Sequence, residues 1–234
     1  MIPKIIHYCW FGNKTIPCNF QSYIEGWQTL MPEYQVIKWD ETNSPIHLNY
    51  CKKAMKKEKW ANLSNFVRLF AVYEHGGFYL DTDVEVILPF DQLRNNQGII
   101  GFSSKYNTYN NDFVVNNAVM GFVPHHPFIK DCMDTLLSQY DGSEEANLSS
   151  PILTTQLLRK NWGLTQYGKQ ILRGDIMILP TEYFYPFDYG EEFSLEVVTS
   201  NTFTVHHWAK TWHASTPNSL KQSFVAIIKH LIKW

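Results

Sequence analysis

The sequence predicts an α/β fold, in which a central β-sheet is flanked by helices. Segments rich in β-branched and aromatic residues alternate along the chain with segments whose apolar residues recur at helical spacing. No internal repeat, low-complexity tract or linker divides the 234 residues, so we expect a single domain over 1–234. Strands separated by helices favour a largely parallel sheet, into which antiparallel strands can be mixed.

The first forty residues predict a strand, a helix and a second strand. Residues 4–10 are apolar and β-rich and lie between a proline and a glycine, which is typical of a strand. Residues 19–30 place apolar side chains at helical spacing and stop before Pro32. Residues 34–39 alternate between two faces and predict the second strand.

The next segment predicts a helix that leads directly into a strand. Residues 60–75 carry an apolar stripe at helical spacing, and Gly76 and Gly77 follow as a common helix end. Residues 78–88 are mostly β-branched and aromatic, so they predict a strand whose first half is interrupted or ended by two aspartates.

The rest of the chain continues the alternation. We expect further strands over 98–103, 117–123, 176–179 and 202–208, and helices over 127–140, 152–160 and 218–234. The last of these helices is amphipathic, with leucine, isoleucine and phenylalanine on one face and lysines beside them. It lies either on an anionic membrane surface or against the protein's own core, and both alternatives stay open.

Composition and charge exclude several classes of protein. Twenty lysines and arginines face 22 aspartates and glutamates, a balance that argues against nucleic-acid binding. Four scattered cysteines, Cys9, Cys18, Cys51 and Cys132, form no zinc or disulfide pattern. No secretory signal pattern opens the chain, and no apolar run reaches the roughly 20 residues that span a bilayer. We expect a cytoplasmic protein that contacts the inner face of the membrane, if at all, through 218–234.

Asp81-Thr82-Asp83 is the segment from which chemistry is best inferred. Residues two apart in a strand share a face, and the carboxyl end of a strand in an α/β sheet is where ligands bind. Mg²⁺ and Mn²⁺ accept few protein carboxylates and take further oxygens from water and phosphate. The alternative is a pair of solvated acids. The apolar neighbours Phe78, Leu80 and Val84 favour the metal, because acids inside an apolar strand need a partner.

Four segments resemble glycosyltransferase family 32, whose members transfer sugars from nucleotide donors and carry a DXD motif. These are Ile2-Pro3-Lys4-Ile5-Ile6-His7-Tyr8-Cys9-Trp10-Phe11-Gly12, Ser64-Asn65-Phe66-Val67-Arg68 with the later Asp81-Thr82-Asp83, Tyr183-Phe184-Tyr185-Pro186, and Thr204-Val205-His206-His207-Trp208-Ala209-Lys210-Thr211-Trp212. The family includes capsular and lipopolysaccharide sugar transferases and yeast-type mannosyltransferases and is related to clostridial glucosylating toxins. The resemblance implies a GT-A fold with a Rossmann-like mixed sheet, a metal-bound nucleoside diphosphate sugar, and retention of anomeric configuration.

The resemblance also implies a donor site. It places Tyr8, Trp10 and Tyr79 at the donor, with Trp10 stacking on uracil, an interaction worth about 1–3 kcal/mol. Arg68 contacts the sugar or the diphosphate. Because an arginine on an apolar helix needs an anionic partner in any case, a salt bridge between Arg68 and Asp81 is also open.

Asn65 departs from the family pattern, in which an aspartate commonly stands three residues before this arginine and binds sugar hydroxyls. An amide offers both an acceptor and a donor without charge. The identity of the donor sugar is therefore open, and Asn65 favours an N-acetylated sugar more than the usual aspartate would.

By the same resemblance, Asp83 ligates the metal directly, and Asp81 reaches the ribose, the sugar or a metal-bound water. His206 or His207 completes the coordination; strand alternation points only one of them inward, and we choose His206. Thr211 and Trp212 close over the β-phosphate and exclude water.

Arg68 and Asp81 are the electrostatic and positioning residues that the pattern suggests for catalysis. No nucleophile is identified, although Asp112 and Asp188 are available as carboxylates.

The function expected from these residues is retaining, Mn²⁺- or Mg²⁺-dependent transfer of a sugar to a glycan or lipid-linked glycan. UDP-Gal, UDP-Glc and UDP-GlcNAc are the donors considered, and bacterial surface polysaccharide is the product. Two alternatives remain: a metal-dependent nucleotidyltransferase or phosphohydrolase that uses the same carboxylates, and a non-catalytic carbohydrate-binding module. In the binding module Arg68, Asp81 and Asp83 would be dispensable.

Overall fold

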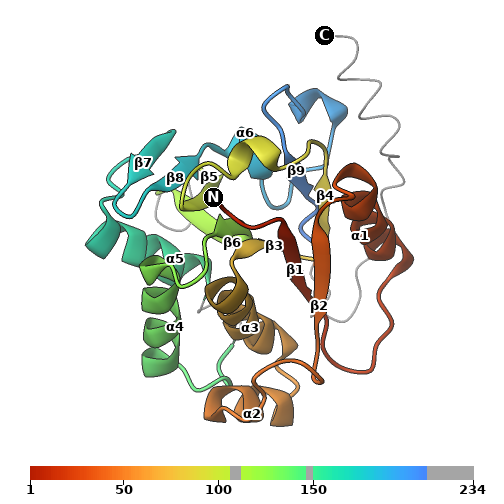
Figure 1. Ribbon diagram of the computed structural model, residues 1–234, viewed down its shortest axis with the longest axis vertical. Coiled ribbons are helices and arrows are strands. Elements are labelled where there is room, and N and C mark those ends of the chain that lie inside the picture. The colour runs from red at the N-terminus through yellow and green to blue at the C-terminus, as the bar shows by residue number, and fades with distance from the viewer. Residues whose placement is uncertain (106–111, 146–149, 210–234) are drawn as a thin grey trace.

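The computed structural model describes residues 1–105, 112–145 and 150–209, and its centre is a seven-stranded sheet (Figure 1). The strands of this sheet are β1 (Ile5–Cys9), β2 (Gln35–Trp39), β3 (Gly77–Leu80), β5 (Gly98–Ser104), β6 (Val114–Phe122), β7 (Gln170–Leu172) and β8 (Ile176–Leu179). Their order is β2-β1-β3-β6-β5-β8-β7. Two further strands, β4 (Val84–Val86) and β9 (Thr204–His206), form a separate antiparallel pair.

The helices lie on both faces of the sheet. They are α1 (Cys18–Leu30), α2 (Asn49–Lys56), α3 (Trp60–His75), α4 (Pro127–Gln139), α5 (Pro151–Leu157) and α6 (Thr181–Phe184). Single 3₁₀ turns cover Asp91–Leu93 and Leu195–Val197, and a π-helical turn covers Leu158–Trp162. The predicted α/β class is confirmed.

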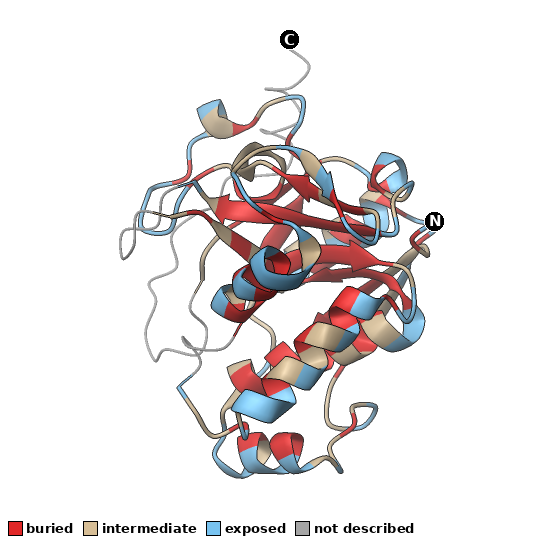
Figure 2. Ribbon diagram, turned by 90° about the vertical axis from the view of Figure 1, so that its left-hand side faces the viewer, coloured by how far each residue is buried: buried red, intermediate tan, exposed pale blue. Residues whose placement is uncertain are grey.

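Two apolar cores pack against opposite faces of the sheet. One contains the buried sides of α2, α3, α4 and α5, and the other contains those of α1, α6, β4 and part of the β9 region. In β3, Tyr79 faces the first core, whereas Phe78 and Leu80 face the second. Because both faces are covered, the central strands are buried along their length, as Figure 2 shows, and they read as apolar runs.

Parallel and antiparallel pairing contribute equally to the sheet, so the mixed sheet that the resemblance implied is confirmed, although parallel pairs do not dominate it as the alternation of strands and helices suggested. β1 pairs parallel with β2 and β3, and β5 pairs parallel with β8, while β6 runs antiparallel to both β3 and β5. Only residues 105–113 connect β5 to β6, too few for a parallel crossover, and residues 173–175 similarly join the antiparallel β7 and β8.

The predicted strand over 78–88 is divided at the aspartates. β3 ends at Leu80, the chain turns so that the Val84 N–H donates to the Asp81 carbonyl at 3.1 Å, and β4 leaves the main sheet to pair with β9. The two carboxylates therefore lie in a turn at the carboxyl end of β3.

Several boundaries differ from expectation. α2 was not predicted, because it is short and lysine-rich and buries only Tyr50, Cys51 and Ala54. The short elements β7 and α6 also lack a periodic signal of useful length. β6 begins at Val114 instead of 117, the helix expected to 160 changes to the π-helical turn after Leu157, and β9 covers only 204–206 of the expected 202–208. The predicted helix over 218–234 lies outside the described residues. Among those the structure describes, no helix has the length and apolarity needed to cross a membrane.

His7 on β1 is a buried, neutral histidine that lies beside Trp39 of the first core. The Trp39 Nε1–H donates to its Nδ1 at 3.1 Å, so its Nε2 carries the proton and donates to the Gly76 carbonyl at 2.8 Å. The side chain is 0% exposed, and this burial lowers its pKa to about 4.

We expect His7 to make the protein less stable in mild acid. Its folded pKa of about 4 lies below the unfolded value of roughly 6.5, so the unfolded chain binds more protons between these values. The contribution of His7 is complete above pH 6.5 and is lost as the pH falls toward 4; about 2 kcal/mol of unfolding free energy disappears between pH 7 and pH 5. Urea unfolding at both pH values measures this loss. A His7→Gln variant is the control, and an identical pH dependence in both proteins would contradict the assignment.

Candidate active site

The site lies where the parallel and antiparallel parts of the sheet meet, at the carboxyl ends of β1 and β3. Asp81 follows β3 directly, and its N–H donates to the Ala118 carbonyl of the neighbouring antiparallel strand β6 at 2.9 Å. Asp83 stands immediately before β4, and His206 ends β9, the partner of β4. The chain thus brings together residues separated by more than 120 positions.

Asp81, Asp83 and His206 form a group suited to a divalent cation. One ligand atom from each lies within 4.8 Å of the other two. His206 Nε2 is 3.3 Å from Asp83 Oδ1, and His206 Nδ1 is buried with no hydrogen-bond partner among the described residues. Two carboxylates and an imidazole suit Mn²⁺, and the carboxylates also suit Mg²⁺. The residues present therefore fit the ion that the DXD pattern implies.

The three ionisable groups shift one another's pKa. Burial raises the pKa of Asp81, the charge of Asp83 adds to this effect, and Arg68 opposes it. Burial also acts against ionisation of Asp83, but His206 and the Ala209 N–H hold its pKa below the usual range. Burial disfavours the charged form of His206, yet the two carboxylates together raise its pKa. A cation between these carboxylates would remove their mutual repulsion.

The backbone after β9 fixes one oxygen of Asp83. The chain turns at Trp208, whose φ of 55° lies in the left-handed region that bulky residues rarely adopt. This turn lets the Ala209 N–H donate to Asp83 Oδ2 at 2.7 Å, while the His207 N–H donates to the Asp83 carbonyl at 3.0 Å.

Arg68 projects from α3 toward Asp81, and its side chain is only 8% exposed. Its guanidinium lies 3.2 Å from Asp81 Oδ1 and packs over the ring of Tyr79, 4.6 Å from the ring centroid. The Tyr79 hydroxyl donates to the same Asp81 oxygen at 2.8 Å. The salt bridge to Asp81 that the sequence left open is present, and two residues, Arg68 and Tyr79, hold the same oxygen of Asp81.

Asn117 on β6 is a site residue that sequence reasoning missed. Its carbonyl accepts from Arg68 at 3.2 Å, and its buried amide donates to the hydroxyls of Ser150 at 2.6 Å and Thr154 at 3.4 Å. It therefore ties Arg68 to the start of α5. The available signal was the polar pair Asn116-Asn117 inside an otherwise apolar strand.

Of the aromatic residues expected at the donor, Trp10 is half-buried, whereas Tyr8 and Tyr79 are buried in the core. Trp10 follows β1, is half-buried, and donates from Nε1 to the Lys14 carbonyl at 2.7 Å. Tyr8 packs edge-on against Trp27 in the core, and Tyr79 is 1% exposed. Asn65 is buried one helical turn before Arg68. Thr211 and Trp212 lie outside the described residues.

His206, and not His207, lies beside Asp81 and Asp83. His207 turns to a different partner and is also shielded from solvent, because its side chain is only 9% exposed and lies 2.9 Å from Glu85. The two other acids considered are elsewhere: Asp112 is ion-paired with Arg159, and Asp188 is exposed beside Glu191.

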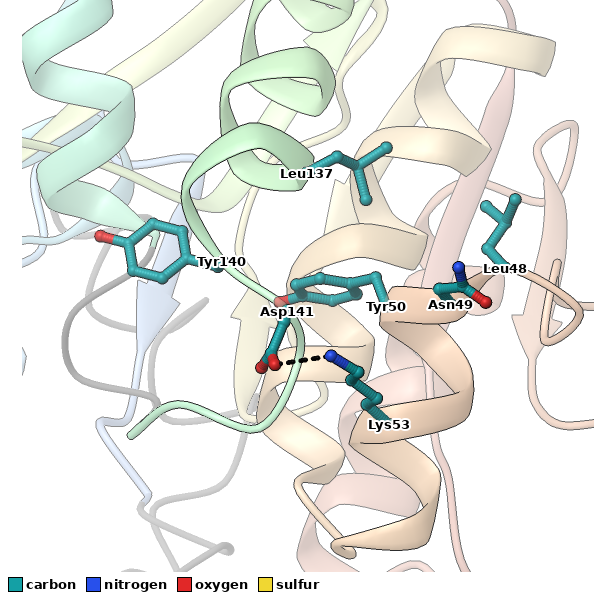
Figure 3. A pocket seen from close by; sticks show the side chains of 7 residues that line it. All are labelled: Leu48, Asn49, Tyr50, Lys53, Leu137, Tyr140 and Asp141. Atoms are coloured by element: carbon teal, nitrogen blue, oxygen red, sulfur yellow. Dashed lines mark hydrogen bonds and ion pairs between the residues drawn. The ribbon is translucent and has the colours of Figure 1, made fainter.

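A separate hollow of about 290 Å³ lies between α2 and α4, bridged by a Lys53–Asp141 ion pair of 2.8 Å (Figure 3). Its lining residues are Leu48, Asn49, Tyr50, Lys53, Leu137, Tyr140 and Asp141, none of which belongs to the group around Asp81.

Two family models match the chain, and each covers part of this site. Residues 17–100, which include Asp81 and Asp83, match the glycosyltransferase sugar-binding region containing the DXD motif. Residues 121–230, which include His206, match the alpha 1,4-glycosyltransferase conserved region. The fold is of the GT-A class. Both matched regions are similar to glycosyltransferases, and the first carries their DXD motif.

The relatives that the sequence matches are also named as glycosyltransferases. The chain is 28% identical to human alpha-1,4-N-acetylglucosaminyltransferase over 75% of its own length and 48% of the relative's. It is 29% identical to human lactosylceramide 4-alpha-galactosyltransferase over 63% of its length and 41% of the relative's. An uncharacterized glycosyltransferase of Acanthamoeba polyphaga mimivirus is 25% identical over 91% of this chain and 84% of that protein. The chain thus spans less than half the length of its human relatives.

The fold is similar to that of the PaToxG glycosyltransferase. The TM-score is 0.57 at 21% identity, and the match covers 68% of this chain and 70% of that chain.

Proposed function

We propose that this enzyme transfers a hexose or an N-acetylhexosamine from a UDP-sugar to a glycan hydroxyl, with Mn²⁺ or Mg²⁺ held by Asp81, Asp83 and His206. The observation that carries the proposal is the convergence of these three side chains, within 4.8 Å, at the carboxyl end of β3. A bound cation would neutralise the negative charge that develops on the leaving diphosphate.

The chain's own residues hold the reactants. Arg68 and Tyr79 fix Asp81, so its carboxylate is oriented before a donor binds. The Ala209 N–H fixes Asp83 in the same way. We assign Trp10 to the nucleobase because its indole is half-exposed at the end of β1. The positive guanidinium of Arg68 adds a preorganised charge near the diphosphate, the kind of electrostatic stabilisation that is usually the largest catalytic contribution.

We infer an α-1,4 linkage from the names of the relatives and from the chemistry of the donor. Both human relatives are named as alpha-4-transferases, and the common UDP-hexoses carry an α-linked sugar. An α-1,4 product from such a donor retains the anomeric configuration. Asn65, which replaces the usual aspartate one turn before Arg68, favours an N-acetylated sugar, the kind named for the first human relative.

The acceptor we propose is a glycan or lipid-linked glycan of a bacterial surface polysaccharide, such as a capsule or lipopolysaccharide. The amphipathic sequence over 218–234 supports contact with the inner face of the membrane, where lipid-linked acceptors are found.

A donor screen tests the proposal. Nucleotide sugars are incubated singly with the protein and Mn²⁺, and slow hydrolysis or transfer is followed by mass spectrometry. We expect turnover of a UDP-sugar, with UDP-GlcNAc the preferred donor, and loss of turnover in EDTA. Absence of turnover and of binding with every nucleotide sugar would contradict the proposal, and release of diphosphate without sugar transfer to any acceptor would contradict the transfer step.

A further inference from the structure

Glu85 and His207 form a second buried acid–histidine pair next to the one at the proposed metal site. His207 Nε2 lies 2.9 Å from Glu85 Oε2, and the two side chains are only 9% and 7% exposed. His207 follows His206 directly, and Glu85 is two residues after Asp83. Neither residue belongs to the group of three that would hold the ion, so the pair needs another explanation.

The His207 ring is held on two sides by aromatic rings. Tyr23 on α1 stacks on it with a centroid distance of 4.9 Å and an interplanar angle of 6°, and Phe193 meets it edge-on at 5.6 Å. Tyr23 in turn stacks with Phe20, which contacts Trp10 edge-on at 6.5 Å. Figure 1 shows α1 beside β4, the strand that pairs with β9. A continuous series of packed aromatic rings therefore links His207 to Trp10, the residue assigned to the nucleobase.

The segment that carries His207 also holds Asp83. The His207 N–H donates to the Asp83 carbonyl, and the Ala209 N–H donates to the Asp83 carboxylate. His206, one residue earlier, is the third member of the metal group. A shift of residues 206–209 would therefore move His206 directly and break the two backbone hydrogen bonds that hold Asp83.

A buried carboxylate such as Glu85 is costly unless it is paired, so its bond to His207 is a strong restraint on the spacing of β4 and β9. Metal affinity depends on ligand positions held to within about half an ångström. Side chains that orient ligands without touching the metal commonly change its affinity by about 10- to 100-fold when they are replaced.

We propose that Glu85 and His207 are positioning residues, whose hydrogen bond locks β4 to the end of β9 and so sets the distance between Asp83 and His206. This inference rests on the proposed metal-dependent function. In this role the Glu85–His207 pair acts by holding the ligands in position, not through the negative charge of Glu85. The role therefore differs from one in which Glu85 attracts the cation electrostatically.

Three variants separate these roles. Glu85→Leu removes the bond to His207, whereas Glu85→Gln keeps an oxygen that accepts it but loses the charge. His207→Phe keeps the stack on Tyr23 and serves as a second break of the pair if Glu85→Leu does not fold. The matched control is His126→Gln, which changes another buried histidine, one that precedes α4 and is bonded to the Gly174 carbonyl at 2.9 Å.

Two measurements are made on each folded protein: Mn²⁺ affinity by calorimetry, and amide hydrogen exchange without metal. We expect Glu85→Leu and His207→Phe to weaken Mn²⁺ binding by about tenfold or more and to speed exchange at residues 207 and 209. Glu85→Gln and His126→Gln should stay close to wild type in both measurements.

Equal Mn²⁺ affinity in wild type and the two pair-breaking variants would overturn the positioning role, as would unchanged exchange at residues 207 and 209. A Glu85→Gln variant as weak as Glu85→Leu would show that charge, not geometry, is what Glu85 supplies. If the wild type itself bound no Mn²⁺, the proposed metal function would be wrong, a result distinguishable from all of these.

Discussion

Replacing Asp83 with asparagine is expected to reduce metal-dependent sugar transfer by about a thousandfold. The amide keeps an oxygen for the Ala209 N–H, so the turn after β9 should persist, but the charge that faces the cation is lost. Transfer kinetics at saturating Mn²⁺ measure the effect, and the melting temperature shows separately whether the variant is folded.

Asp134→Asn is the matched control, because Asp134 is an exposed acid on α4 that pairs only with Lys130 among the contacts described. It should transfer sugar at the wild-type rate. Wild-type activity in Asp83→Asn would mean that the carboxylate does not hold the cation.

Replacing Arg68 with methionine is expected to lower both activity and stability. The change removes the guanidinium that pairs with Asp81, so Asp81 faces the like charge of Asp83 without a positive partner from the protein. It also removes the donor to the Asn117 carbonyl. Breaking a buried pair in this way costs about 3 kcal/mol, and the loss of a charge near the diphosphate should lower kcat by about 100-fold or more. Urea unfolding and single-turnover transfer measure the two effects separately.

Arg68→Lys tests the geometry of the guanidinium. A single ammonium cannot at once pair with Asp81, donate to Asn117 and cover the Tyr79 ring, so we expect it to recover part of the stability but little of the activity. Full activity in the lysine variant would show that only the positive charge matters.

The carboxylate pair Asp81 and Asp83 could be singled out from the sequence because its signal is local. An acid pair that interrupts an apolar strand after two glycines indicates both a turn and a candidate cation site. Arg68 was predictable for a similar reason, since an arginine on a mostly buried helix needs an anionic partner, and Asp81 is that partner.

What could not be predicted depends on contacts between distant segments. The pairing of β4 with β9 joins residues 84–86 to residues 204–206, and only this pairing decides that His206 meets Asp83 while His207 meets Glu85. Strand alternation placed one histidine outward, but β9 ends at His206, and the left-handed turn at Trp208 follows directly. Asn117 was missed because its role depends on Arg68, Ser150 and Thr154, which lie on other elements.

The central claim is that Asp81, Asp83 and His206 together hold a divalent cation that the nucleotide donor needs. Calorimetric titration of UDP into the protein, with Mn²⁺ and then with EDTA, tests it most directly. We expect one UDP per chain, bound much more tightly with Mn²⁺, and no Mn²⁺ effect in Asp83→Asn or His206→Ala. Equal UDP affinity in Mn²⁺ and EDTA, or a Mn²⁺ effect unchanged in both variants, would contradict it.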